Sequence, residues 1–135
     1  MRLWHQDLIK HLPRQQLLGQ HRECCALRGA GWDRRHSVVN YVFDYDPSRL
    51  VAYHYLVMNE MEKRGYHPDP IWRNANWRGT RLGEQIGWAN DDTVSNHLFS
   101  VRDDNYLLYL EHNSSYLKEC LENLRGKGIE IDGYV

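Results

Sequence analysis

The chain of 135 residues has little of several features that would point to a particular class of protein. It contains no run of 18 apolar residues, so we expect no membrane-spanning helix. The segment from Met1 to Asp7 lacks the apolar core of a secretory signal. Only three cysteines occur, and Cys24 and Cys25 are adjacent, which is a poor geometry for bridging each other. We therefore expect a cytoplasmic protein in a reducing compartment.

Metal-ligand motifs are scarce as well. Neither C-x-x-C nor H-x-x-x-H occurs, and the eight histidines are scattered along the chain. His21 and Cys25 share a helical face at a spacing of four residues, but cysteine on a helix is more often a core residue. We therefore predict neither a metal ion nor a cofactor.

A strong overall charge is also missing, because the formal net charge is −1. The charges are nevertheless unevenly distributed. Residues 1–36 carry seven basic and three acidic side chains, whereas residues 83–135 carry four basic and ten acidic ones. This polarity indicates one face suited to an anionic partner, or it reflects chance on a solvated surface.

The aromatic residues form an unusual mixture of five Trp, nine Tyr and only two Phe. Amphipathic rings suit stacking on nucleic-acid bases, and they equally suit the edge of a core. Residues 71–81 contain two Trp and three Arg without an acid, including Arg73, Trp77 and Arg78. Such a basic aromatic patch is typical of nucleic-acid contact. The alternative is a loop in which the arginines stack on the tryptophans and pack on the domain.

Helical signals dominate the rest of the chain. Residues 66–96 hold two Pro and three Gly and are predicted to be irregular, and residues 38–43 fit either a strand or a buried helix. We predict a mainly α fold, a single compact domain over residues 1–135 with at least three helices and one long irregular loop. Apolar spacing, Asp46-Pro47 as a helix start and the following glycines predict helices over residues 14–28, 47–64, 103–112 and 114–125.

The first of these helices carries a candidate catalytic carboxylate. Gly19, Glu23, Ala26 and Ala30 fall on neighbouring positions of one face, so the glutamate lies in a strip of small residues with room for a ligand. Arg22 is its neighbour in the sequence. An acid flanked by bases is a plausible general acid or base toward a negatively charged substrate. A surface glutamate paired with a helical neighbour is the alternative.

These residues also resemble a known family. Residues 17–23 (LLGQHRE) are similar to the helix of phage-type pyrimidine-dimer DNA glycosylases, the endonuclease V-like proteins, in which the glutamate of an Arg-Glu pair is catalytic. The start at residues 1–4 resembles the short basic and apolar N-terminus of that family. Residues 29–31 followed by 34–36 resemble its Gly-Ala and basic-basic-His segment. Residues 62–66 are similar to its Lys-Arg-Gly-aromatic helix end.

The resemblance implies a mostly helical DNA repair glycosylase with AP-lyase activity on damaged pyrimidines. It implies that the protein kinks duplex DNA, flips a base, and attacks C1′ of the nucleotide with an N-terminal α-amine, without metal or cofactor. That amine would belong to Met1, Glu23 would act as acid and base, and Arg22 would assist. The expected substrate-binding residues are Arg2, Arg14, His21, Arg34, Arg35, His36, Arg73, Trp77 and Arg78.

Two other interpretations stay open. The acidic C-terminal half suggests a nucleic-acid or modified-nucleotide binding module that shares the fold without the chemistry. An unrelated small-molecule hydrolase or interaction protein, with chemistry based on His21, His36 or His54, is the third.

Overall fold

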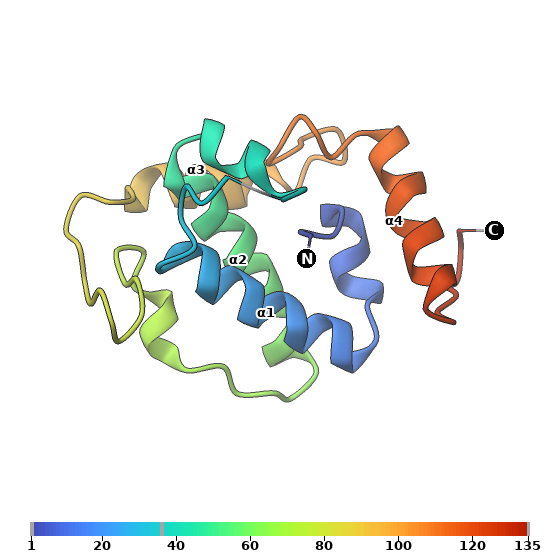
Figure 1. Cartoon of the computed structure of the whole chain (residues 1–135), viewed down its shortest axis with the longest axis horizontal. Coiled ribbons are helices and arrows are strands. Elements are labelled where there is room, and N and C mark those ends of the chain that lie inside the picture. Colours follow the sequence, from blue (N-terminus) through green and yellow to red (C-terminus); the bar gives the residue numbers. More distant parts are fainter. Residues whose placement is uncertain (1, 36, 135) are drawn as a thin grey trace.

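The computed structural model describes residues 2–35 and 37–134, and Figure 1 shows them as a helical bundle with long connections. No β-strand occurs in these two ranges, so the predicted mainly α class is confirmed. No helix there is long and apolar enough to cross a membrane. The α-helices are α1 (Arg14–Arg28), α2 (Pro47–Lys63), α3 (Asp91–Ser100) and α4 (Ser114–Gly126), and the short 3-10 helices are η1 (Gln6–His11), η2 (Asn40–Asp44) and η3 (Pro70–Arg73).

Helix α2 is the central element, and α1, α3 and η1 all pack against it (Figure 1). Its start agrees with the sequence pattern, because the Asp46 side chain accepts a hydrogen bond from the Ser48 amide and Pro47 occupies the first turn. Its end follows from Gly65, which adopts a φ of 87° that side chains with a Cβ disfavour. Most side chains of α2 are buried, as expected for a helix covered on several sides.

The core joins elements that are far apart in the sequence. Leu8 of η1, Leu17 of α1, Leu50 of α2 and Leu124 of α4 are all completely buried. Burying a leucine contributes about 1.5–3 kcal/mol relative to leaving it exposed. Helix α4 is therefore part of the same core as η1, α1 and α2.

The helix predicted over residues 103–112 is wrong, and the helix of this region is α3. Asn90 caps α3 by accepting from the Thr93 amide. The backbone of the predicted segment pairs with side chains instead. Gln6 donates to the Tyr106 carbonyl and accepts from the Leu108 amide, at 2.8 Å in both cases. These contacts satisfy the polar backbone groups that a helix would otherwise have paired internally.

The irregular segment between α2 and α3 is attached to the helices by a buried arginine. Arg28, with no exposed surface, donates from Nη1 to the carbonyl of Trp72 at 2.9 Å, and from Nη2 to those of Asn74 at 2.7 Å and Trp77 at 3.0 Å. Its guanidinium also lies 5.0 Å from the centre of a Trp72 ring. Burial lowers the pKa of Arg28 to about 10. Carbonyl dipoles thus compensate a charge that burial would otherwise make very unfavourable.

Three histidines are buried in the fold, at His5, His54 and His112. Burial lowers the pKa of each, and that of His112 falls to about 3. Nε2 of His112 is 2.7 Å from the Tyr41 hydroxyl, and its ring stacks on His5. All three are therefore neutral in the folded protein at neutral pH.

We expect the protein to lose stability below about pH 6.5, where these histidines bind protons only in the unfolded chain. Each of them should lower the free energy of unfolding by up to about 1.4 kcal/mol per pH unit. For His112 the loss should continue down to its folded pKa of about 3. Urea denaturation between about pH 7 and about pH 4.5 measures the slope. The substitution His112→Asn should reduce it, whereas His67→Gln at an exposed position should not. An unchanged slope in His112→Asn would contradict the assignment.

Candidate functional site

Glu23 of α1 lies at a pocket of about 400 Å³. The carboxylate is half-buried, and this burial raises its pKa above the ordinary value. Arg22 lines the same pocket and is exposed, so its guanidinium is accessible to a ligand. A carboxylate with a raised pKa beside an accessible cation is an arrangement suited to proton transfer near a phosphate.

Gly19 shapes this pocket, as the strip of small residues predicted. A Cβ built at position 19 would come within 3.7 Å of Nη2 of Arg22. The guanidinium of Arg22 therefore lies back along the helix over Gly19, one turn before Glu23. The other two residues of the strip, Ala26 and Ala30, line a different pocket.

The N-terminal segment reaches the pocket because Gln20 binds its backbone. The Gln20 side chain is buried, accepts from the Trp4 amide at 2.6 Å and donates to the Arg2 carbonyl at 3.0 Å. The Tyr53 hydroxyl of α2 is 2.7 Å from the same Gln20 oxygen and donates to the Trp4 carbonyl at 2.6 Å. These contacts fix residues 2–4 against α1 one turn before Glu23.

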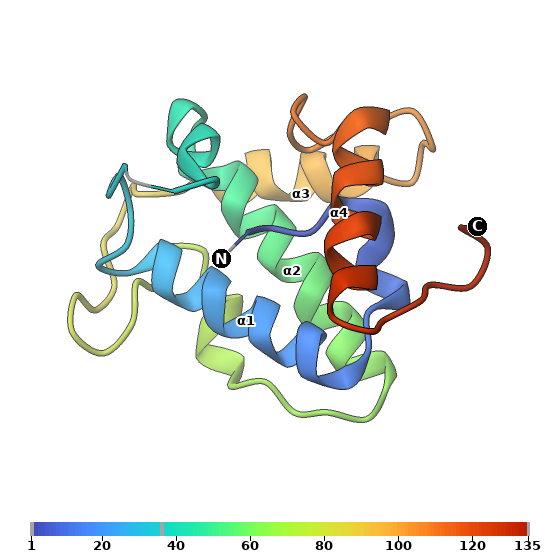
Figure 2. The ribbon, with the colours of Figure 1, turned by 45° about the vertical axis from the view of Figure 1, so that its right-hand side comes forward.

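Helix α4 holds the same segment from another side, and Figure 2 shows the segment crossing α2 toward α4. The Tyr116 hydroxyl donates to the Leu3 carbonyl at 2.5 Å. Arg2 forms an ion pair with Glu119 at 3.3 Å, and its guanidinium lies 5.9 Å from the ring centres of both Trp4 and Tyr116. Arg2 therefore lines the pocket as a cation whose side chain is positioned by Glu119 and the two rings.

Met1 and His36 lie outside the described residues, so the predictions for them stay predictions. Arg2, the residue next to Met1, lines the pocket together with Glu23. The pocket thus brings together three of the residues predicted from the sequence, Arg2, Arg22 and Glu23. Sequence reasoning missed Trp4, Gln20 and Lys127, which also line it.

Arg34 and Arg35 follow α1 and do not line the Glu23 pocket. Nε of Arg34 donates to the Ala30 carbonyl at 2.8 Å. Arg35 forms ion pairs with Asp33 and Asp44, both at 2.7 Å. Both arginines are exposed, and the Arg35 contacts connect the segment after α1 to the end of η2.

Two more predicted arginines are placed beside aromatic rings. The guanidinium of Arg14 lies 5.5 Å from the centre of the Tyr66 ring. That of Arg73 lies 5.2 Å from the Tyr55 ring and pairs with Glu62 at 2.6 Å. Neither residue lines the Glu23 pocket.

Trp77 and Arg78 line a second pocket, of about 610 Å³, between the end of α1 and the loop that Arg28 holds. The guanidinium of Arg78 is bound mostly by other groups of the protein. It donates to the carbonyls of Arg28 at 2.8 Å and Gly29 at 3.1 Å, and it stacks 4.6 Å from a Trp88 ring. The alternative of a packed loop with arginines stacked on tryptophans therefore describes Arg78 well.

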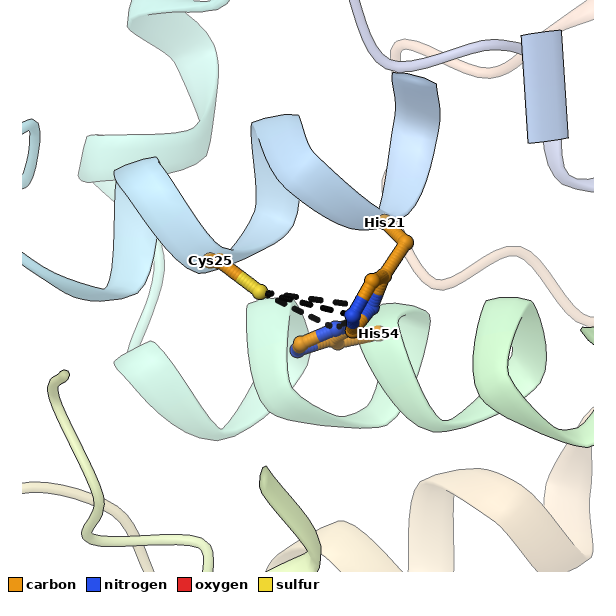
Figure 3. A group of neighbouring side chains, drawn as sticks. All are labelled: His21, Cys25 and His54. Atoms are coloured by element: carbon orange, nitrogen blue, oxygen red, sulfur yellow. Dashed lines mark hydrogen bonds between the residues drawn. The ribbon is translucent and has the colours of Figure 1, made fainter. Parts of the chain in front are cut away.

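His21 faces neither pocket and instead meets His54 and Cys25 (Figure 3). Nδ1 of His21 is 2.8 Å from Nε2 of His54, and the Cys25 sulfur is 3.8–3.9 Å from the ring nitrogens. Burial lowers the pKa of both histidines and raises that of Cys25 to about 11. The spacing of four residues could pair His21 with Cys25, but only the packing of α2 on α1 adds His54.

We expect Gln20→Leu to lower the free energy of unfolding by about 2–4 kcal/mol, because it leaves buried polar groups of residues 2–4 unpaired. Urea denaturation measures this loss, and hydrogen exchange of the Trp4 amide should become faster. The matched control is Gln16→Leu, on the same helix and lining the same pocket, which should change stability by about 0.5 kcal/mol at most. Equal effects of the two substitutions would show that Gln20 does not hold the segment.

Comparison with known protein families matches residues 1–74 to the pyrimidine dimer DNA glycosylases. No curated protein and no solved structure matches the chain. The matched part exceeds half of the chain and contains α1 with Arg22 and Glu23, the segment bound by Gln20, and α2. This chain therefore belongs to the pyrimidine dimer DNA glycosylase family.

Proposed function

We propose that the protein is a DNA glycosylase with AP-lyase activity on damaged pyrimidines. Family membership implies a DNA substrate. The observation that supports the proposal best is one pocket lined mostly by residues of the matched region, where a partly buried Glu23 meets Arg22 and the N-terminal segment at Arg2. An amine, a carboxylate and cations are the groups that the chemistry requires.

The proposed nucleophile is the α-amine of Met1. An α-amine has a pKa near 8, so a useful fraction is unprotonated at neutral pH, unlike a lysine side chain. The nitrogen would attack C1′ of the damaged nucleotide, the bond between C1′ and the base would break, and the base would leave with the bonding electrons. Loss of a proton from nitrogen and opening of the sugar ring would give a Schiff base. Removal of a proton from C2′ would then expel the 3′ phosphate by β-elimination.

Glu23 is proposed to move the protons in this sequence. As a carboxylate it would stabilise the positive charge that develops on the sugar, and it would accept the proton lost during elimination. The burial that raises its pKa supports this role, because a carboxyl group with a raised pKa exchanges protons more readily near neutral pH.

Arg22 and Lys127 are proposed to hold phosphates of the DNA around the pocket. Both line it, and both are exposed. Arg2 lines it as well, and its ion-pair partner Glu119 is 63% exposed, so a phosphate could replace that carboxylate at small cost. The three cations surround Glu23 from α1, from the N-terminal segment and from the residue after α4.

A second candidate function is a binding module for damaged or modified nucleotides without cleavage. The observation that favours it is that Arg35, Arg73 and Arg78 already have partners within the protein. Fewer free cations predict weak binding to undamaged duplex. Cleavage tests distinguish this module from the enzyme.

Borohydride trapping on an oligonucleotide with a cyclobutane dimer should give a covalent adduct at the Met1 amine, located by mass spectrometry. The substitution Glu23→Gln should reduce the rate of base release by about 10²–10⁴-fold, the usual contribution of a positioned acid or base. The matched control is Glu122→Gln, an exposed carboxylate of α4, which should leave the rate unchanged.

An extension of two residues before Met1 provides a separate test of the nucleophile. It removes the amine from its position, so trapping should fail while binding to the lesion persists. Full cleavage by the extended protein would overturn the amine mechanism. Lesion binding without adduct or cleavage, unchanged by Glu23→Gln, would establish the binding module instead.

A further inference from the structure

The cluster of His21, Cys25 and His54 has no part in the function proposed above. Its three side chains come from α1 and α2, which pack against each other, and they point at one another (Figure 3). One donor atom from each side chain lies within 4.8 Å of the others. Two imidazoles and one thiol so close together are a donor set typical of transition-metal sites.

We propose that His21, Cys25 and His54 bind a zinc ion, with a solvent molecule as the fourth ligand. Zinc is bound in proteins by imidazole nitrogen and thiolate sulfur in tetrahedral geometry. Three protein ligands and a water give the open type of zinc site. The site would connect α1 to α2 without contributing to the Glu23 pocket.

The distances between donors are close to those that zinc requires. With zinc–nitrogen bonds of about 2.0 Å and zinc–sulfur bonds of about 2.3 Å, tetrahedral geometry separates two nitrogens by about 3.3 Å and a nitrogen from sulfur by about 3.5 Å. The His21 and His54 nitrogens are 2.8 Å apart, and the sulfur is 3.9 Å from each. Movements of the donor atoms by a few tenths of an ångström would therefore bring them to the separations that zinc requires.

Arg28 determines the tautomer of His54. Its Nη1 is 3.0 Å from Nδ1 of His54 and can only donate, so neutral His54 carries its hydrogen on Nε2, directed at His21. A neutral imidazole binds zinc through a nitrogen without hydrogen, so zinc binding would transfer this hydrogen to Nδ1 of His54 and release the proton of the Cys25 thiol. The thiolate would offset one of the two charges of the ion. Arg28 would give up its contact with Nδ1 and keep its three carbonyl partners.

Access to the cluster is from the second pocket. Cys25 lines that pocket of about 610 Å³ and is only partly buried, whereas His54 is completely buried. The ion would thus be bound by His54 on its buried side and by a solvent molecule on the side of the pocket. Because the second pocket is separate from that of Glu23, the inference does not depend on the proposed enzyme activity.

Cobalt(II), a spectroscopic probe for zinc sites, tests the proposal on the full chain freed of metal by a chelator. We expect one cobalt ion per chain, with visible bands of a four-coordinate ion and a near-ultraviolet thiolate-to-cobalt band, all abolished by zinc. Cys25→Ser should remove the thiolate band, and His54→Gln should weaken binding at least about tenfold. Cys24→Ala and His67→Gln, which alter a buried thiol and an exposed imidazole outside the cluster, should keep both band and affinity.

Alkylation of Cys25 gives a second readout that needs no substitution of the cluster and so does not depend on how the cluster variants fold. Zinc should slow its modification by iodoacetamide in the native protein, with Cys24→Ala removing any signal from the neighbouring thiol. The proposal is overturned if cobalt gives no thiolate band, if the band survives in Cys25→Ser, or if zinc leaves the alkylation rate unchanged.

Discussion

The buried guanidinium of Arg28 makes the contacts on which the segment between α2 and α3 depends. No carboxylate of the described residues pairs with it, and its charge is compensated by three carbonyl groups of the loop and by the ring of His54. The carbonyls of Trp72 and Trp77 would lose this partner without it, whereas that of Asn74 also accepts from the Trp77 amide at 3.0 Å. One side chain thus joins the end of α1, the middle of α2 and a loop whose one regular element is the short helix η3.

Gln20, in the middle of α1, does the same for the N-terminal segment. The two buried polar residues are eight positions apart, which corresponds to about 12 Å along a helix. Glu23 lies between them, one turn after Gln20. The position of the carboxylate relative to the N-terminal segment is therefore set by a helix, a rigid element, and by hydrogen bonds from a buried amide, so it does not depend on the flexibility of a loop.

The sequence predicted the helices that have strong boundary signals. It also predicted which residues close together in the chain share a site. Asp46-Pro47 and Gly65 placed α2, and the spacing of Gly19 to Glu23 placed the carboxylate at a pocket. Contacts made by tertiary packing were not predictable from spacing. His54 joins His21 only because α2 packs on α1. The helix expected over residues 103–112 failed because Gln6, about a hundred residues away, pairs with its backbone.

The family-matched region, residues 1–74, shares its core and its polar contacts with the rest of the chain. It ends at a carbonyl that Arg28 binds, so the boundary passes through the set of contacts that attaches the loop. It also omits Tyr116, which holds Leu3, and the buried residues of α4 that complete the core. The matched segment is therefore supported by a C-terminal part that covers its apolar surface and adds Lys127 to the Glu23 pocket. Apolar substitutions in α4 should preserve the position of Glu23 as long as they continue to cover the same surface.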